Sequence, residues 1–458
     1  MTIKELSILG FRGFSQNQHL ELAIPDGKSG SGLTVLVGPN NSGKSTIIES
    51  FKYLSLRNAT PSFADSKRNK KAGDKIAISL KSETNGILSL RTQSGSSEST
   101  YEENDLKKTD INLYVLPSRR AFSPFFGKNQ WNREAVINNS EVGTTRAGTY
   151  SAFEYRIFDI QKNPEKYNEV LGKVLGKVPV WTIDQSDTGQ YFIKFNYNGD
   201  YHNSDGAGEG LLSVYTIVET LFDSKEGDTI VIDEPELSLH PALQKKVLEL
   251  LMEYSKDRQI IISTHSPFFI DWESLINGGK LVRVIKETDG IKIYPIHPDA
   301  PKIVEKLTSN LNNPHILGLD AKEIFFLDDD INIVEGQEDV IFYKKIFELL
   351  KLKLNGTFYG WGIGGSGNLD HILKILQSLG FKKINCILDN DMKSLKETLE
   401  KEYPEYSFVL IPTNDVRDKE QREIKAKEGL ISSDGKTINS KYAKEVTEIV
   451  HQINKYFN

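Results

Sequence analysis

Short apolar runs of four or five residues, each followed by a turn and then a helical pattern, recur along the chain. Such runs are typical of parallel strands that are buried on both faces of a sheet. In the first part of the sequence they lie at Thr34–Val37, Thr229–Ile232 and Gln259–Ser263. These runs predict an α/β domain whose mixed sheet contains parallel strands and is covered by helices.

A second, more compact series of strands and helices begins at Asn332–Val334. Its further members are predicted to alternate between helix and strand at Glu338–Leu352, Thr357–Trp361, Leu369–Leu379, Lys383–Leu388, Lys393–Glu402 and Ser407–Ile411. Because repeated βα units build a parallel sheet of their own, we expect a smaller second domain. The boundary should fall near residues 315–328, after Asn312, Asn313 and Pro314. This gives domains 1–322 and 323–458.

Two polar stretches lie inside a lobe, about residues 52–200, that is inserted into the first domain. Lys67–Lys75 is basic, and Thr92–Asn104 is rich in serine and glutamate. Both predict surface loops between strands. A charge run is usually solvated. Contact with nucleic acid is therefore the weaker of two alternatives for Lys67–Lys75, and also for Arg119 and Arg120.

Length and composition indicate a globular protein of more than one domain. A chain of 458 residues with 38% hydrophobic and 26% charged residues fits two or three globular domains. No apolar run approaches the ~20 residues of a membrane span, and the N-terminal segment lacks a signal-peptide pattern. We therefore expect a cytoplasmic protein with no membrane partner. Cys386 is the only cysteine, which excludes an internal disulfide framework and a cysteine-based zinc cluster.

The net charge of −6 excludes a protein coated in basic residues. Nucleic acid, if it binds, must therefore bind a local basic patch, helped by metal ions that neutralise acidic residues.

The segment Gly38–Thr46 matches the phosphate-binding loop pattern G-x-x-x-x-G-K-[ST], with an apolar strand before it and an amphipathic helix after it. Glycine lets backbone N–H groups curl around phosphate oxygens, and the helix adds its positive N-terminal end. Lys44 should reach the terminal phosphates of ATP, and the Ser45 hydroxyl should hold Mg²⁺. The predicted nucleotide-binding residues of the loop are Gly38, Asn40, Asn41, Ser42, Gly43, Lys44, Ser45 and Thr46.

Two carboxylates end the apolar strand Thr229–Ile232. Asp233 should hold Mg²⁺, mostly through water, and Glu234 should polarise the attacking water. A solvated turn is the alternative for an Asp-Glu pair after a strand. The solvated turn is the less favoured interpretation because Glu236–Pro241 follows directly. In addition, another apolar strand ends in Ser263–Pro267 about thirty residues later.

This ordered set resembles the ABC ATPases, and more closely the branch that includes SMC proteins and DNA-repair ATPases. The resemblance implies that Asp233 and Glu234 form the Walker B motif and that Leu237–His240 is the D-loop. It also implies that His265 is the switch histidine that senses the γ-phosphate. Arg12, in a segment that looks like the first hairpin of this branch, would lie near the nucleotide.

The same resemblance implies a signature loop that completes the ATP site of a partner subunit. The best candidate is Asp205–Gly210, where Gly206 and Gly208 could approach a phosphate at a helix N-terminus. It departs from the family pattern at Ala207, where a serine is expected. The departure puts in doubt how strongly ATP drives closure of a dimer. No glutamine can be assigned to the Q-loop.

Acidic residues also follow two strands of the second series. Glu335 stands at a strand end before a glycine, Asp339 comes four residues later, and Asp389 and Asp391 end another strand in D-x-D spacing. The carboxyl ends of neighbouring parallel strands meet at one edge of a sheet. Converging carboxylates repel one another unless cations neutralise them, and oxygen ligands favour Mg²⁺ or Mn²⁺. We therefore predict a metal site at Glu335, Asp339, Asp389 and Asp391.

This arrangement resembles the TOPRIM domain of topoisomerases, primases and the overcoming-lysogenisation-defect (OLD) family of nucleases. The glutamate-glycine turn is matched by Glu335 and Gly336, and the glycine-rich turn facing the site by Gly362–Gly367. The order, with the ATPase first and TOPRIM second, points to the OLD family. In that family a C-terminal basic residue lies near the scissile phosphate, and Lys419 or Arg417 could fill the role. A charged surface loop is an equally good interpretation of these two residues.

The resemblance implies a protein that binds and hydrolyses ATP and cuts nucleic acid, DNA rather than RNA, with Mg²⁺ or Mn²⁺. It implies catalytic roles for Glu234, His265, Glu335, Asp389, Asp391 and Lys419. It further implies a homodimer formed through the ATPase heads, or a larger assembly, and service in prokaryotic defence against phage, alone or with a partner protein or nucleic acid.

Two alternatives remain. In the first, the ATPase is a sensor or scaffold whose TOPRIM-like domain docks an effector protein or nucleic acid without cutting. In the second, the chain is an SMC-like repair ATPase. That class should carry a long heptad coiled coil between the phosphate loop and the signature, and the sequence contains none.

Overall fold

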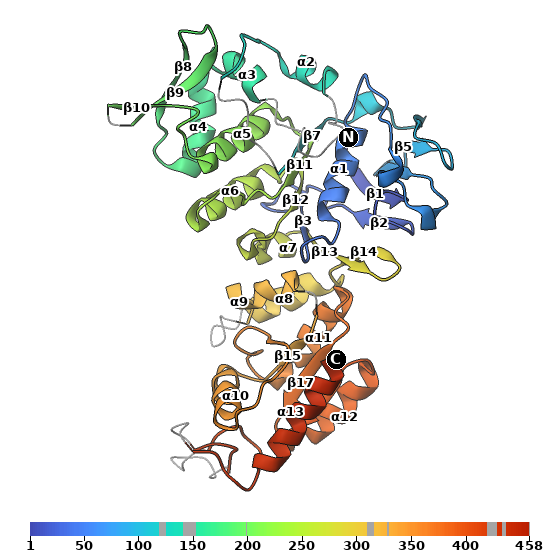
Figure 1. Ribbon diagram of the computed structural model, residues 1–458, viewed down its shortest axis with the longest axis vertical. Coiled ribbons are helices and arrows are strands. Elements are labelled where there is room, and N and C mark those ends of the chain that lie inside the picture. The colour runs from blue at the N-terminus through green and yellow to red at the C-terminus, as the bar shows by residue number, and fades with distance from the viewer. Residues whose placement is uncertain are drawn as a thin grey trace. The chain divides into compact units, whose positions relative to one another are not determined.

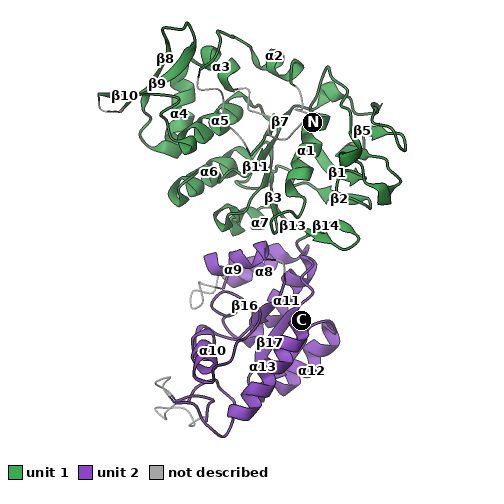
Figure 2. Ribbon diagram, viewed as in Figure 1, with its two compact units in different colours: residues 1–295 green, residues 296–458 purple. Residues whose placement is uncertain are grey.

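The computed structural model describes residues 1–118, 125–140, 153–197, 199–308, 316–327, 329–418, 428–432 and 437–457. It divides the chain into two compact units, Met1–Pro295 and Ile296–Asn458 (Figure 2). The expected boundary at residues 322/323 therefore falls inside the second unit. The reason is local: the His297 N–H donates to Ser378 Oγ (2.9 Å), and the Trp361 indole N–H donates to Asp320. These contacts attach the connecting helices to the second unit.

The centre of the first unit is a six-stranded sheet in the order β14-β13-β3-β12-β11-β7. All neighbours in it are parallel except the hairpin β13–β14. Its strands are β3 (Leu33–Val37), β7 (Leu113–Leu116), β11 (Thr229–Asp233), β12 (Gln259–Ser263), β13 (Lys280–Glu287) and β14 (Gly290–Pro295). β3, β11 and β12 are buried throughout, so the three predicted apolar strands are confirmed.

Helices cover both faces of this sheet. Figure 1 shows α5 (Glu209–Asp223) and α6 (Pro241–Tyr254) on one side and α1 (Lys44–Leu54) on the other. α7 (Trp272–Ile276) leads into β13. Burial of apolar faces on both sides of parallel strands is what the continuous apolar runs require.

A second, antiparallel sheet in the order β2-β1-β4-β5-β6 packs against the other side of α1. Its strands are β1 (Ile3–Leu9), β2 (Gln18–Glu21), β4 (Ala77–Ser82), β5 (Ile87–Thr92) and β6 (Ser99–Asn104). Apolar side chains of both sheets and of the helix form one buried cluster, which includes Phe11, Phe51, Ile78 and Val231. The predicted loop Thr92–Asn104 is wrong in part, because its second half pairs with β5 as strand β6.

A smaller lobe holds α2 (Arg133–Asn138), α3 (Phe153–Ile160), α4 (Pro164–Leu175) and the sheet β10-β9-β8, formed by β8 (Val180–Gln185), β9 (Tyr191–Tyr197) and β10 (Asp200–Asn203). Ion pairs join it to α5. Arg156 Nε donates to Asp223 Oδ2 at 3.0 Å and lies 3.7 Å from Glu219 Oε1. The side chains of Arg156, Glu219 and Asp223 are only 5%, 4% and 10% exposed. Each buried charge is therefore stabilised by its oppositely charged partners.

The second unit contains a four-stranded sheet, β16-β15-β17-β18, that is parallel throughout. The strands are β15 (Ile331–Ile333), β16 (Thr357–Phe358), β17 (Ile384–Leu388) and β18 (Ser407–Leu410). The helices are α8 (Ala300–Thr308), α9 (Leu319–Glu323), α10 (Gln337–Leu349), α11 (Leu369–Ser378), α12 (Lys393–Glu402) and α13 (Ala443–Phe457). The predicted βα series is therefore confirmed.

Two fully buried asparagines stand side by side in this sheet. Asn332 of β15 and Asn385 of β17 are direct neighbours in the strand register. The Asn385 amide N–H donates to Asn332 Oδ1 at 3.0 Å, and the Asn332 amide N–H donates to the carbonyl of Asn355 at 2.8 Å. A buried amide without such partners would destabilise the fold.

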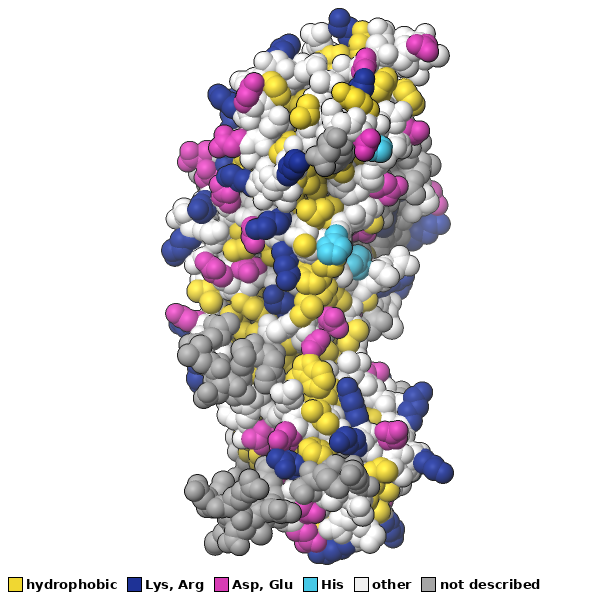
Figure 3. All heavy atoms as spheres, turned by 90° about the vertical axis from the view of Figure 1, so that its left-hand side faces the viewer, with side chains coloured by type: hydrophobic (Ala, Val, Ile, Leu, Met, Phe, Trp, Pro, Cys, Tyr) yellow, Lys and Arg dark blue, Asp and Glu magenta, His cyan; other side chains and the backbone are white. Residues whose placement is uncertain are grey.

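The surface shown in Figure 3 carries lysine and arginine side chains interspersed with aspartate and glutamate, and they form no single basic patch on that face. Among the helices of the described residues, none is both long enough and apolar enough to cross a membrane.

We predict that Arg156→Met lowers the free energy of unfolding by about 3 kcal/mol, because Glu219 and Asp223 lose a buried cationic partner. Chemical denaturation followed by circular dichroism measures the change. Lys162→Met is the matched control: Lys162 pairs with Asp159 at 3.1 Å but is 62% exposed, so its loss should cost under about 1 kcal/mol. Equal effects of the two substitutions would contradict the coupling described for the lobe.

Candidate functional site

The phosphate-loop segment leaves β3 at Gly38 and enters α1 at Gly43. Both glycines have positive φ angles, 135° and 110°. A Cβ at Gly38 would lie 2.2 Å from the carbonyl oxygen of Val284, and a Cβ at Gly43 would lie 2.4 Å from Ile291 Cδ1. Glycine is thus required twice, for backbone conformation and for the close approach of the β13–β14 hairpin.

A pocket of about 330 Å³ opens over this loop. This volume is within the range of small-molecule sites. The predicted loop residues line it, except Gly38, together with residues from four other segments. The lining residues are Arg12, Gly13, Asn40, Asn41, Ser42, Gly43, Lys44, Ser45, Thr46, Glu234, His265, Lys286 and Ile291.

The Lys44 ammonium folds back over the loop. Its Nζ donates to the carbonyl oxygens of Gly38 (2.7 Å) and Pro39 (2.9 Å). Burial lowers the pKa of Lys44 to about 8, although Asp233, Glu234 and Glu236 act in the opposite direction. Since burial disfavours the charged form, an anion bound beside Lys44 would stabilise the ammonium.

Two further observations suit a bound nucleotide with Mg²⁺. The Ser42 hydroxyl is buried in the loop and has no hydrogen-bond partner among the described residues. Such an orphaned group is costly unless a ligand satisfies it. The Ser45 hydroxyl donates to Asp233 Oδ1 at 3.3 Å, so the two predicted Mg²⁺ ligands stand together at the loop.

Glu234 and His265 reach the pocket from the ends of β11 and β12. Glu234 has a positive φ of 51°, and its N–H donates to the carbonyl of Ser263 at 2.7 Å. A non-glycine residue in this conformation is held against a local preference. Burial and the Lys44 charge lower the pKa of His265, which favours the neutral imidazole.

Glu236 is a residue of this site that the sequence reasoning did not select. Its carboxylate accepts hydrogen bonds from the His265 N–H (2.6 Å) and the Thr264 hydroxyl (2.8 Å). Burial raises its pKa. The side chain thus joins the turn after β11 to the turn that carries His265. In the sequence, its place two residues after Glu234, in Glu234-Pro235-Glu236, was the one available signal.

Arg12 lies at the pocket, in a turn with a positive φ of 50°. The Arg12 guanidinium forms an ion pair with Glu49 of α1 at 2.7 Å. The backbone N–H of Arg12 donates to the carbonyl of Lys67 at 2.8 Å. The basic stretch Lys67–Lys75, predicted as a surface loop, contains short 3₁₀ segments, and four of its residues, Lys70, Lys71, Gly73 and Lys75, are exposed.

The candidate signature glycines do not line this pocket. Gly206 donates its N–H to Asn203 Oδ1 at 2.9 Å, and Gly208 is the N-cap of α5. The neighbouring Gly210 approaches the predicted D-loop so closely that a Cβ would lie 2.4 Å from the Ser238 carbonyl oxygen. The Ser238 hydroxyl also donates to Glu209 at 3.0 Å.

In the second unit, the predicted acids surround Asp389. Burial, together with the negative charges of Asp339, Asp415, Glu335 and Asp391, raises the pKa of Asp389 to about 7. Asp415 was not among the predicted ligands, because it follows β18 after a loop that has no motif. Oxygen-only donors of this kind suit Mg²⁺ or Mn²⁺. Within the described residues, however, no three acidic, histidine or cysteine side chains are placed to hold one ion.

Backbone N–H groups donate hydrogen bonds to several of these acids, and Asp415 Oδ1 accepts one from the Arg417 N–H at 3.3 Å. Asp339 Oδ2 accepts from the Gly336 N–H at 2.8 Å, which caps α10. Glu335 Oε1 accepts from the Ser366 N–H at 3.3 Å. A Cβ at Gly362 would lie 2.6 Å from the backbone carbon of Gly336, so the glycine-rich turn packs directly on the Glu335 turn.

Of the two basic residues predicted after β18, only Arg417 lies among the described residues. Arg417 forms a bidentate ion pair with Glu338 of α10: Nε donates to Oε2 at 2.9 Å and Nη2 donates to Oε1 at 3.0 Å. Lys419 lies outside the described residues, as do Arg119 and Arg120.

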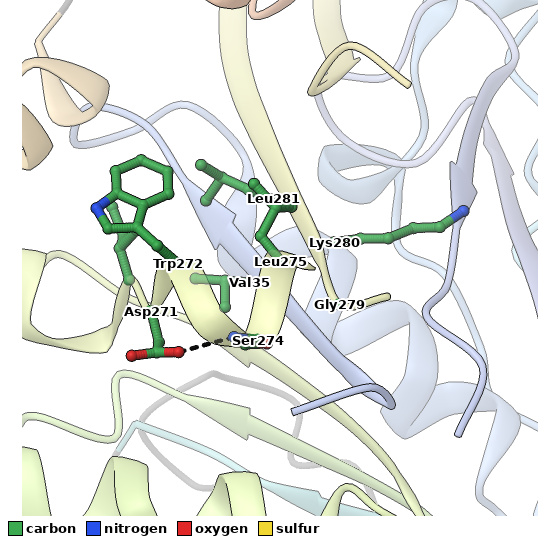
Figure 4. Close-up of a pocket in the computed structure, with 9 residues that line it drawn as sticks. Val35, Asp271, Trp272, Ser274, Leu275, Gly279, Lys280 and Leu281 are labelled. Atoms are coloured by element: carbon green, nitrogen blue, oxygen red, sulfur yellow. Dashed lines mark hydrogen bonds between the residues drawn. The ribbon is translucent and has the colours of Figure 1, made fainter. Parts of the chain in front are cut away.

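A smaller hollow in the first unit, of about 10 Å³, lies between β3, α7 and β13. Figure 4 shows Trp272, Leu275 and Leu281 around it, and Asp271 accepting a 2.7 Å hydrogen bond from the Ser274 N–H. This is about the space that a single water molecule needs, and Asp271 serves there as the N-cap of α7.

Comparisons with known proteins give matches to parts of the chain. The family model described as "AAA ATPase domain" matches residues 1–175, and the model described as "AAA domain, putative AbiEii toxin, Type IV TA system" matches residues 144–271. Endonuclease GajA from Bacillus cereus is 28% identical over 213 residues, which are 45% of this chain and 34% of that protein.

Two other relatives carry the OLD name. Old nuclease of Escherichia phage P2 is 28% identical over 35% of this chain and 27% of its own length. OLD nuclease of Thermus scotoductus is 24% identical over 38% of this chain and 33% of its own length. Over these stretches the chain is similar in sequence to the three named nucleases. The matches span about a third of the length of these relatives or less.

Among solved structures, an SMC head bound to the winged-helix domain of ScpA matches with a TM-score of 0.45 and 15% identity, over 65% of this chain and 98% of that chain. The SMC head domain from Thermotoga maritima matches with a TM-score of 0.39 and 18% identity, over 65% and 100%.

We predict that Glu236→Ala lowers kcat for ATP hydrolysis at least about tenfold and leaves ATP affinity unchanged, because the His265 turn loses its anchor. Glu236→Gln keeps one acceptor and should lose less. Steady-state hydrolysis and equilibrium ATP binding separate the two parameters. The control is Glu249→Ala on the exposed side of α6. A loss of affinity without a loss of kcat would refute the positioning role.

Proposed function

We propose that this chain is an ATP-binding and ATP-hydrolysing, metal-dependent nuclease of the OLD type. The observation that carries the proposal is the presence of two separate sites. One is the phosphate-loop pocket of the first unit, and the other is the group of carboxylates around Asp389 in the second. The names of the relatives, all nucleases, support the same assignment.

At the nucleotide site, Lys44 would bind the terminal phosphates, while Ser45 and Asp233 would hold Mg²⁺. Glu234 would orient and polarise the attacking water, and a neutral His265 would contact the γ-phosphate. Glu236 would keep the His265 turn in place. Gly206 and Gly208, which lie outside this pocket, would complete the site of a second subunit in a homodimer or larger assembly.

At the nuclease site, Glu335, Asp339, Asp389 and Asp391, with Asp415 beside them, would hold Mg²⁺ or Mn²⁺. Such ions supply an activated water and offset the charge that develops on a phosphodiester. The carboxylates would fix the positions of the ions. The nearby cation Arg417, freed from Glu338, and Lys419 would contact the phosphate backbone of the substrate, which we expect to be DNA rather than RNA.

We further propose, from the resemblance to the OLD family alone, that the protein serves in the cytoplasm of a prokaryote in defence against phage, alone or with a partner.

A second candidate function is a sensor or scaffold that docks a partner through the second unit without cutting. It is favoured by one observation, that no three potential ligands of the described residues are placed to share an ion. The cleavage assay below decides between the two.

Lys44→Ala should weaken ATP binding at least about 100-fold, because the phosphates lose their buried cationic partner. Isothermal titration calorimetry measures the affinity. Lys256→Ala removes an exposed lysine of the same unit and should bind ATP like the wild type. Normal ATP binding by the Lys44 variant would overturn the assignment of the pocket.

Asp389→Asn should reduce cleavage of nucleic acid at least about 100-fold while ATP binding stays intact, since the central carboxylate of the cluster is lost. The assay uses supercoiled plasmid, single strands and RNA with Mn²⁺, with and without ATP. Glu400→Gln, on the exposed side of α12, is the control. Cleavage that survives in the Asp389 variant refutes the nuclease site, and a wild type that cuts none of these substrates favours the docking function.

A further inference from the structure

The β13–β14 hairpin packs directly on the phosphate loop. Ile291 of β14 packs against Gly43 of this loop and against Gly13 of the Arg12 turn, since a Cβ at these two glycines would lie 2.4 and 2.5 Å from Ile291 Cδ1. The Ile291 N–H also donates to the Gly13 carbonyl at 2.9 Å. The side chain of Ile291 therefore forms a wall of the nucleotide pocket, although no recognised motif includes it.

Lys286 lies opposite Ile291 in the hairpin register and lines the same pocket. It is exposed, and within the described part of the chain it forms no ion pair or hydrogen bond through its side chain. Two other lysines of the hairpin are paired: Lys280 with Glu21 at 2.8 Å and Lys292 with Asp289 at 3.0 Å. Lys286 is thus a cation with no partner of its own at the mouth of an anion site.

The order of the strands fixes the side of the pocket on which Lys286 stands. β3, which carries the phosphate loop, lies between β12 and β13. Glu234 and His265 follow β11 and β12 on one flank. Lys286 belongs to β13 on the other flank, where Gly13 contacts Ile291. It therefore lines the pocket from the flank opposite Glu234 and His265.

We propose that Lys286 is a further nucleotide-binding residue, whose ammonium contacts the phosphate nearest the nucleoside, with Ile291 packing beside it. The inference rests on the proposed ATP binding by the first unit. Because that phosphate is common to ATP and ADP, Lys286 contributes equally to both nucleotides and does not take part in hydrolysis. The β13–β14 hairpin is then part of the binding site as well as the end of the first unit.

The test compares Lys286→Gln with Lys280→Gln in the full chain. Both remove one positive charge from β13, but Lys280 stands at the opposite end of the strand, roughly 20 Å away at the usual rise per residue. Calorimetry with ATP and ADP gives the affinities, and steady-state hydrolysis gives KM and kcat. Lys286→Gln should weaken both nucleotides about tenfold and raise KM with kcat unchanged, and Lys286→Arg should restore binding.

Affinities of Lys286→Gln that equal those of Lys280→Gln would overturn the inference and leave the proposed ATP site standing. A fall in kcat at unchanged affinity would also overturn it, because Lys286 would then act in hydrolysis. Absence of nucleotide binding by the wild type would overturn both the ATP site and this inference.

Discussion

The phosphate loop keeps its shape because two of its positions admit no side chain. Gly38 meets the backbone of β13, and Gly43 meets Ile291 of β14, each at a distance that only a hydrogen on Cα permits. The loop is therefore held between the sheet below it and the hairpin beside it. Lys44, Ser42 and the N-terminus of α1 are placed by this confinement, and the pocket follows from it.

Much of the fold could be predicted from the sequence, because parallel strands buried on both faces leave continuous apolar runs. The strand Gln259–Ser263 and the helix Lys393–Glu402 agree with the prediction to the residue. Thr92–Asn104 failed because an edge strand with one solvated face looks polar. The domain limits differed because α8 and α9 have no strand of their own, and only their tertiary contacts assign them to the second unit.

The candidate site divides in the same way. Residues in short, fixed spacings, such as Lys44, Asp233 and Asp389, could be selected from the chain alone. Glu236, Asp415 and Lys286 could not, because each acquires its place only when distant segments pack together. The accepted hydrogen bonds of Glu236 come from a turn about thirty residues away, and Lys286 reaches the pocket from a strand that follows every nucleotide motif.

The hydrogen bond between the amides of Asn332 and Asn385 favours one register of β15 against β17 in the second sheet. Sliding β15 against β17 by one residue would turn the side chains to the wrong faces, and sliding by two would separate the amides in an apolar interior. The observed register pairs Asn332 with Asn385, and the chain leaves these two neighbouring strands towards Glu335 and Asp389. A polar contact in the interior of the sheet thus favours the register in which these carboxylates become neighbours.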